Sequence, residues 1–124
     1  MDTGSAANEA AKKIILQYFA KEKQTPEPER TLFIARHHSY HGTTAGALAS
    51  SGHSPRRVPF KSNIPDDTHF VSACRPYRDL QDGMTESEYV QQLAQEMEDK
   101  IVALGSRKVA AVFIEPVVGA VSSF

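Results

Sequence analysis

Residues 31–44, TLFIARHHSYHGTT, decide the fold. Residues 31–35 are apolar and β-prone, which predicts a short buried strand. The next four residues are polar and end this pattern, and Tyr40, His41 and Gly42 follow them. Ligands of open α/β sheets bind at the carboxyl ends of the strands, so this position favours a planar ligand that Tyr40 stacks on and His41 hydrogen-bonds. The alternative interpretation is that the two side chains only pack beneath a loop.

A second strand is predicted at residues 109–114, VAAVFI, because every position is apolar. Such a run is typical of a strand covered on both faces in a parallel sheet. Between the two strands, Thr85 and Glu88 have the spacing of a capping box, and apolar residues at steps of three and four continue to Leu104. Gly105 is expected to end this helix in a left-handed cap. A strand, a crossover that contains a helix, and a strand define an α/β fold, with a mostly parallel sheet and flanking helices.

The N-terminal segment predicts an amphipathic helix that begins at Gly4 and Ser5. Apolar residues recur at steps of three and four from residue 7 to residue 19. Most charged residues, Lys12 and Lys13 among them, fall on the opposite face, which we expect in solvent. The free N–H groups and the dipole at the start of a helix favour a bound phosphate, so Gly4 and Ser5 form a candidate anion site. A simple helix cap is the alternative.

The middle of the chain has less regular patterning. Residues 43–51 are small and predict a short helix that ends at Gly52. Residues 53–83 are interrupted by prolines, and only residues 69–72 resemble a strand. A loop region of this length is expected to be either functional or covered by a partner.

The chain of 124 residues is enough for one domain with one modest core. Its formal net charge of −1 argues against nucleic-acid binding, and no apolar run is long enough to span a membrane. The N-terminus lacks the pattern of a signal or transit peptide, and the single cysteine, Cys74, excludes an internal disulfide, so we expect a cytoplasmic protein. Three strands and two long helices are too few for a doubly covered sheet, which predicts a piece of a larger sheet.

Several other side chains are candidates for chemistry. Glu115 directly follows the second strand, at the sheet edge where ligands bind, although capping a loop or pairing with an arginine are alternatives. The histidines lack helical spacing, and no cysteine or acid completes a metal-ligand set. They are His37, His38, His41, His53 and His69. Cys74 has no partner that would activate it as a nucleophile. The arginines fit either carboxylate recognition or a solvated surface. They are Arg56, Arg57, Arg75 and Arg78.

Taken in order, three segments resemble the class III aminotransferases, which are pyridoxal-phosphate enzymes of fold type I. Residues 4–11, GSAANEAA, resemble the G-[ST]-E-A-N-E-A-A phosphate cup and helix of that family. Residues 40–43, YHGT, match its aromatic-His-Gly-[RT]-[ST] turn, and residues 109–119, VAAVFIEPVVG, match its strand followed by E-P-[VI]-x-G. Fungal-type members are the most similar, because they share the GHxxRR and YR features that occur here at residues 52–57 and 77–78.

The resemblance implies that residues 1–124 are a fragment of the large domain that binds pyridoxal 5'-phosphate. Gly4 and Ser5 would hold the cofactor phosphate, and Tyr40 would stack on the pyridine ring. His41 would support the Tyr40 turn, and Glu115 would lie near the cofactor and the substrate-binding arginine. The implied parent activity is transfer of an amino group from an amine or amino acid to a 2-oxo acid, in a homodimer.

The chain also departs from the family pattern. Ala6 stands where the motif usually has Glu. In the family, the Asp that pairs with the pyridinium nitrogen and the Schiff-base lysine both follow the E-P-V-x-G stretch, and neither is present in these 124 residues. We therefore expect the chain as written to supply no catalytic residue, which leaves open whether it is an enzyme. The alternative is a catalytically inactive truncated product, or a remnant that binds phosphate or pyridoxal phosphate and associates with a full-length subunit.

Overall fold

The computed structural model describes residues 2–120, and a three-stranded parallel sheet lies at the centre of this part of the chain. The strands are β1 (Leu32–Arg36), β2 (Thr68–Val71) and β3 (Val109–Phe113), in the order β2-β1-β3. Both pairings are parallel, with Phe33 of β1 opposite Thr68 of β2 and Ala111 of β3. The predicted parallel α/β fold is confirmed, as are both predicted main strands and the short strand in the middle of the chain.

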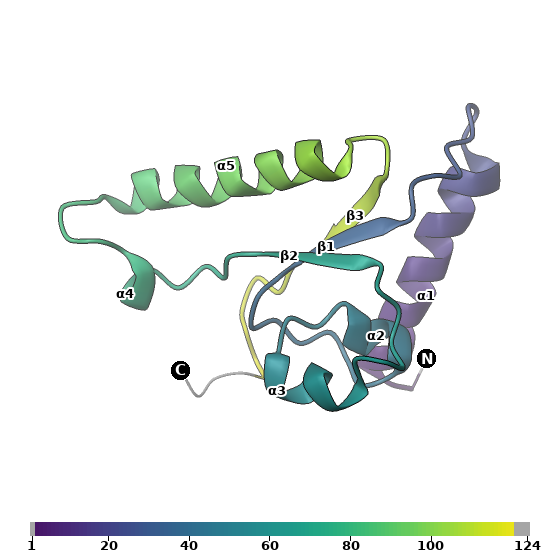
Figure 1. Cartoon of the computed structure of the whole chain (residues 1–124), viewed down its shortest axis with the longest axis horizontal. Helices are drawn as coiled ribbons and strands as arrows, with labels where there is room; N and C mark the ends of the chain where they lie inside the picture. Colours follow the sequence, from purple (N-terminus) through teal and green to yellow (C-terminus); the bar gives the residue numbers. More distant parts are fainter. Residues whose placement is uncertain (1, 121–124) are drawn as a thin grey trace.

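Helices cover the two faces of this sheet (Figure 1). The long helix α5 (Glu86–Leu104) lies along one face. On the other side lie α1 (Gly4–Gln17), which continues as a π-helix (Tyr18–Glu22), and the short helix α2 (Ala45–Ala49). Shorter turns complete the connections: α3 (Ser54–Arg57), a 3-10 helix (Val58–Phe60) and α4 (Pro76–Asp79). No helix within residues 2–120 is long and apolar enough to cross a bilayer.

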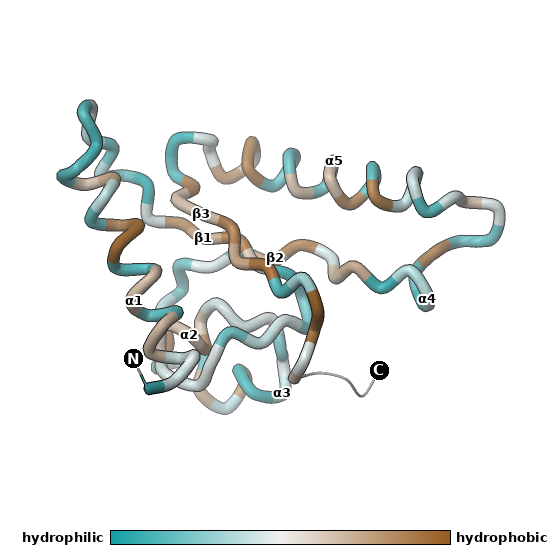
Figure 2. Tube along the Cα trace, turned by 180° about the vertical axis from the view of Figure 1, so that it is seen from behind, coloured by the Kyte–Doolittle hydropathy of each residue, from teal (hydrophilic) through white to brown (hydrophobic). Residues whose placement is uncertain are grey.

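The core follows from the alternation of side chains along β1, where Phe33, Ile34 and Ala35 are all fully buried. Successive residues of a strand point to opposite faces. Ile34 packs with Val71 and Val109, and the α5 residues Met97, Ile101 and Leu104 cover this cluster. Phe33 contacts the aromatic ring of Phe113 at a centroid distance of 5.7 Å. Figure 2 shows the apolar residues concentrated in the strands and along α5.

The ends of α5 agree with the predicted signals except for one backbone angle. Thr85 Oγ1 accepts from the Glu88 amide at 3.2 Å, and the Glu88 carboxylate accepts from the Thr85 amide at 2.8 Å, so the predicted capping box is formed. The bond from the Thr85 amide lowers the pKa of Glu88. Gly105 ends the helix with φ +94° and ψ +111°. The predicted left-handed helical cap is therefore wrong in detail, although the positive φ still requires glycine.

The prediction that β3 is covered on both faces is wrong. Only Val109 is buried, and the side chains of Val112 and Ile114 are 38% and 46% exposed. In the described part of the chain, β3 pairs with β1 along one edge, and no strand lies on its other edge. The apolar run therefore predicted the strand correctly. Residues 2–120 do not supply the packing partners that would bury both of its faces.

The predicted orientation of α1 is also wrong, because Lys12 is buried and only 6% exposed. Its ammonium donates to both oxygens of Asp67, at 2.9 and 3.0 Å, and to the Gly46 carbonyl at 3.4 Å. Glu9, one turn earlier, accepts from the Gly46 amide at 2.8 Å. Meanwhile Ile14, placed on the apolar inner face by periodicity, is 66% exposed. The helix docks through a polar stripe because the surface it meets, at α2, presents backbone N–H and C=O groups.

Candidate functional site

Three segments that are distant in sequence meet at the carboxyl end of the sheet. They are the start of α1, the turn after β1 that contains Tyr40 and His41, and the residues that follow β3. The amide of Tyr40 donates to Glu115 Oε2 at 2.8 Å. The imidazole of His41 lies beside the ring of Phe113, at a centroid distance of 5.7 Å. The turn is therefore attached to the end of β3 by both a hydrogen bond and an aromatic contact.

The same turn is attached to α1. Ser5 Oγ accepts from the Thr43 amide at 3.0 Å, and the side-chain amide of Asn8 donates to the His41 carbonyl. Gly42 makes this close approach possible, because its φ is +136° and a Cβ there would lie 2.6 Å from Ser5 Oγ and 2.8 Å from the Ala47 Cβ. A side chain at position 42 would push the turn away from the helix.

The N-terminus of α1 has the chemistry of an anion site. Thr3 caps the helix, since its hydroxyl accepts from the Ala6 amide at 3.1 Å and its carbonyl accepts from the Ala7 amide at 3.1 Å. The amides of Gly4 and Ser5 belong to the first turn, where a helix supplies no carbonyl of its own to accept from them. The first turn carries no acidic side chain, so the positive end of the helix dipole is not neutralised there.

His41 is the buried polar group of this site. It is 7% exposed, and its backbone amide donates to Ser51 Oγ at 2.8 Å. Its ring atom Nε2 is buried without a hydrogen-bond partner in the described part of the chain. Burial lowers the pKa of His41, and the negative charge of Glu115 partly opposes this effect. The first-turn amides of α1, to which the His41 carbonyl is attached through Asn8, fit an anionic group such as the phosphate of pyridoxal phosphate.

Tyr40 is half-buried, and the guanidinium of Arg56 lies over its ring, 4.5 Å from the centroid. The two side chains line a cavity of about 220 Å³ together with Leu48 and Phe60. Arg56 therefore occupies one face of the Tyr40 ring. The predicted stacking of a pyridine ring on Tyr40 would have to use the other face.

The structure thus brings together the five predicted residues of the cofactor site, with Gly4 exposed at the helix start. Sequence reasoning missed Asn8 and Ser51, which hold His41, and Arg56, which covers Tyr40. Asn8 lies three residues after Ser5 and so on the same helix face, a signal that was available. Ser51 had no such signal. Within residues 2–120, no three histidines, cysteines or acids come together as metal ligands.

Comparison with known proteins places this geometry in a family. The family model described as Aminotransferase class-III matches residues 1–122. This chain belongs to the class III aminotransferases. An aminotransferase of Gibberella zeae is 46% identical over 97% of the chain, and an uncharacterized aminotransferase of Schizosaccharomyces pombe is 42% identical over 96%. The predicted likeness to fungal members is confirmed.

Solved structures of aminotransferases share the fold. An omega-transaminase from Thermomicrobium roseum superimposes with a TM-score of 0.85 and 35% identity over 97% of this chain and 26% of its own. The omega-transaminase of Pseudomonas jessenii in complex with PMP gives a TM-score of 0.85 and 30% identity, over 97% of this chain and 26% of its own. The chain spans about a quarter of the two fungal relatives, 24% and 25% of their lengths. Its sheet and helices are part of the α/β fold of fold type I.

Proposed function

We propose that residues 1–124 are the part of a class III aminotransferase large domain that binds pyridoxal 5'-phosphate. The protein's activity is then transfer of an amino group from an amine or amino acid to a 2-oxo acid. One observation carries the proposal: the turn at residues 40–43 is bonded to Ser5 at the start of α1 and to Glu115 at the end of β3. A phosphate site and a ring site are thereby held next to each other.

Each residue has a separate role in this proposal. The amides of Gly4 and Ser5 bind the phosphate, and Tyr40 orients the ring by offering one aromatic face. Burial favours the neutral form of His41, which supports the Tyr40 turn through the bond from its backbone amide to Ser51 Oγ. Glu115 fixes the turn through the Tyr40 amide. When bound, pyridoxal phosphate supplies the electron sink that transamination needs.

We also propose a homodimer in the cytoplasm. Large exposed apolar side chains on α1 and on the π-helix that continues it are consistent with a subunit interface, because Ile14 is 66% exposed and Tyr18 is 49% exposed. Cys74 is exposed and is the single cysteine of the sequence, which suits a reducing compartment.

A second candidate function, cofactor binding without catalysis, is favoured by the position of Lys12. Transamination requires a lysine whose amine reaches the cofactor. The Lys12 amine is buried and held by Asp67 and Gly46, so it is committed to the packing of α1.

The test is a titration of the purified chain with pyridoxal phosphate, followed by borohydride reduction and mass spectrometry. We expect saturable binding that inorganic phosphate displaces. Ser5→Asp should weaken this binding, because it places a negative charge at the phosphate site, whereas Ser62→Asp, on an exposed turn, should not. Absence of binding would overturn the proposal, and a stoichiometric reduced adduct on one lysine would overturn the second candidate.

The size of the native polypeptide distinguishes the two candidates in the cell. An antibody raised against residues 33–41 should detect a polypeptide several times larger than 13.6 kDa if the domain belongs to a complete aminotransferase. A band at 13.6 kDa that alone carries the epitope supports the second candidate.

A further inference from the structure

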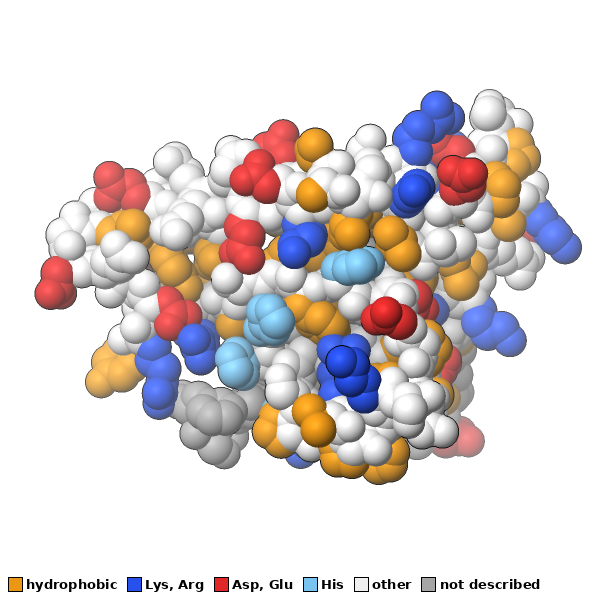
Figure 3. Space-filling view, viewed as in Figure 1, with side chains coloured by type: hydrophobic (Ala, Val, Ile, Leu, Met, Phe, Trp, Pro, Cys, Tyr) orange, Lys and Arg blue, Asp and Glu red, His pale blue; other side chains and the backbone are white. Residues whose placement is uncertain are grey.

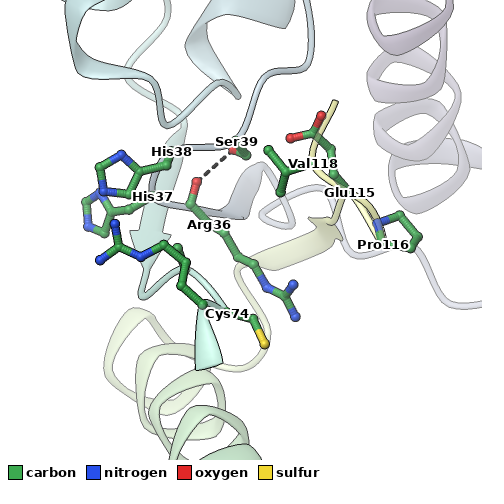
Figure 4. Close-up of a pocket in the computed structure, with 10 residues that line it drawn as sticks. Arg36, His37, His38, Ser39, Cys74, Glu115, Pro116 and Val118 are labelled. Carbon is green, nitrogen blue, oxygen red and sulfur yellow. Dashed lines mark hydrogen bonds between the residues drawn. The ribbon is translucent and has the colours of Figure 1, made fainter. Parts of the chain in front are cut away.

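A cavity of about 370 Å³ opens at the carboxyl end of the sheet and shares only Glu115 with the candidate cofactor site. Figure 4 shows the segments around it: Arg36 at the end of β1 with His37 and His38 directly after it, Cys74 after β2, and residues 115–118 after β3. This volume is in the range of small-molecule sites, and the carboxyl ends of parallel strands are where such sites form. The cavity therefore has both the size and the position of a ligand site.

The two arginines that line this cavity differ in their partners. The Arg75 guanidinium makes two hydrogen bonds to the Asp79 carboxylate, at 2.9 and 3.1 Å, so its charge is balanced. Arg36 is a half-buried residue, and its guanidinium makes no hydrogen bond or ion pair with any residue in the described range 2–120. A partly desolvated guanidinium without a counter-ion is a strong binder of carboxylate, which it meets with two parallel hydrogen bonds.

The end of β1 that presents Arg36 is held by several backbone contacts. The Ser39 hydroxyl donates to the Arg36 carbonyl at 2.7 Å and accepts from the Gly52 amide at 3.1 Å. Gly52 packs so closely that a Cβ there would lie 2.1 Å from the Arg36 carbonyl oxygen. His38 has a φ of +63°, a left-handed conformation that is costly for a residue other than glycine and that gathers at ligand sites. The backbone from which the Arg36 side chain extends toward the cavity is thus fixed.

We propose that this cavity binds a small aliphatic monocarboxylate, with the carboxylate on Arg36. The rest of the ligand would lie against the apolar side chains of Pro116 and Val118. A second carboxylate is disfavoured by the negative charge of Glu115, which also lines the cavity and whose side chain points away from that of Arg36 (Figure 4). On the face seen in Figure 3, histidine and basic side chains lie among acidic ones, so this face is not uniformly acidic.

Cys74 provides a local reporter, because it lines the cavity, is exposed, and is the single cysteine of the sequence. The experiment measures the rate at which neutral iodoacetamide alkylates Cys74 in the 124-residue chain as butyrate is added. Butyramide, which has the same shape and no charge, is the control ligand. We expect saturable protection by butyrate and none by butyramide.

Three variants assign the effect to Arg36. Arg36→Gln should weaken the protection by butyrate about ten-fold or more, the usual effect of losing a hydrogen-bonded charge, and Arg36→Lys should weaken it less. Arg78→Gln removes the same charge from an exposed residue that does not line the cavity, and should leave protection unchanged. Circular dichroism checks that each variant keeps its helix content, and Arg36→Lys keeps the test valid if Arg36→Gln fails to fold. Equal protection by butyramide, full protection in both Arg36 variants, or no protection at all would overturn the proposal.

Discussion

At His41, two influences act on one side chain. Burial favours the neutral imidazole and lowers its pKa, while Glu115 favours the charged form and raises it, and burial is the larger effect. The folded protein therefore binds this proton less readily than the unfolded chain does. The backbone of His41 is meanwhile fixed by Ser51 and Asn8.

This difference predicts how stability depends on pH. Above 6.5, the ordinary pKa of His, His41 is neutral in both states and its contribution is fully present. Below that value the unfolded chain takes up a proton that the folded chain resists, so the free energy of unfolding should fall as the pH falls. Urea unfolding between pH 7.5 and pH 5.5 measures the slope, and His41→Gln should flatten it.

The control for this experiment is His69→Gln, which removes an imidazole from β2, outside the candidate site. The direct measurement is the NMR titration of the His41 ring. A midpoint at or above 6.5, or a slope that His41→Gln leaves unchanged, would contradict the prediction.

At the scale of elements, the ion pair between Lys12 and Asp67 joins α1 to the residue before β2. The Lys12 side chain is 7% exposed and that of Asp67 is 27% exposed. The Lys12 ammonium also lies 4.6 Å from the centroid of the Phe33 ring, over the central strand. One buried amine therefore contacts a helix, a loop and the sheet.

Removing that amine should be costly, because it leaves the Asp67 carboxylate partly buried without a partner. We expect Lys12→Met to lower the free energy of unfolding by about 3 kcal/mol. Lys12→Met combined with Asp67→Leu should recover part of this loss, since no uncompensated charge then remains. Lys13→Met, at the exposed neighbouring position, is the matched control and should change stability little. Chemical denaturation of the four proteins checks this, and equal losses in Lys12→Met and Lys13→Met would refute it.

Elements were predicted well where the signal is local. The capping box at Thr85, the apolar run of β1 and the positive φ at Gly105 depend on neighbours in sequence. The orientation of α1 could not be predicted in this way, because Lys12 meets Asp67, which is 55 residues distant. Periodicity identifies the apolar face of a helix, but the surface against which the helix packs decides which face is buried.

The candidate site was predictable in part for the same reason. The ends of parallel strands meet at one edge of a sheet, so the approach of Tyr40 to Glu115 followed from the strand assignments alone. The residues that hold the turn through contacts from other loops could not be predicted from the strand assignments. Ser51 and Arg56 reach it through the path of the loop after α2, which no periodicity describes.

At the scale of the whole molecule, β3 has an edge without a strand in the described part of the chain, and apolar side chains lie beside it. Such edges pair with other chains unless a charge or a covering element prevents it. We expect the isolated chain to self-associate with increasing concentration, and Val112→Lys to reduce this association. Val90→Lys, on α5 and 58% exposed, tests whether any charge in place of an apolar residue has the same effect.

Sedimentation velocity over a range of concentrations measures the association. If Val90→Lys and Val112→Lys reduce it equally, general surface apolarity rather than the strand edge is responsible. A chain that stays monomeric at all concentrations would contradict the prediction.

The strand order has a consequence for the time course of synthesis. Leu32 of the central strand pairs with Val109, 77 residues later in the chain. A ribosome adds about 5–20 residues per second, so β1 is made about 4–15 s before its partner β3 exists. During that interval Phe33, Ile34 and Ala35, which end fully buried, have only β2 to pair with. The rate of translation thus sets how long the most buried strand of this sheet waits, and how long chaperones have to bind it.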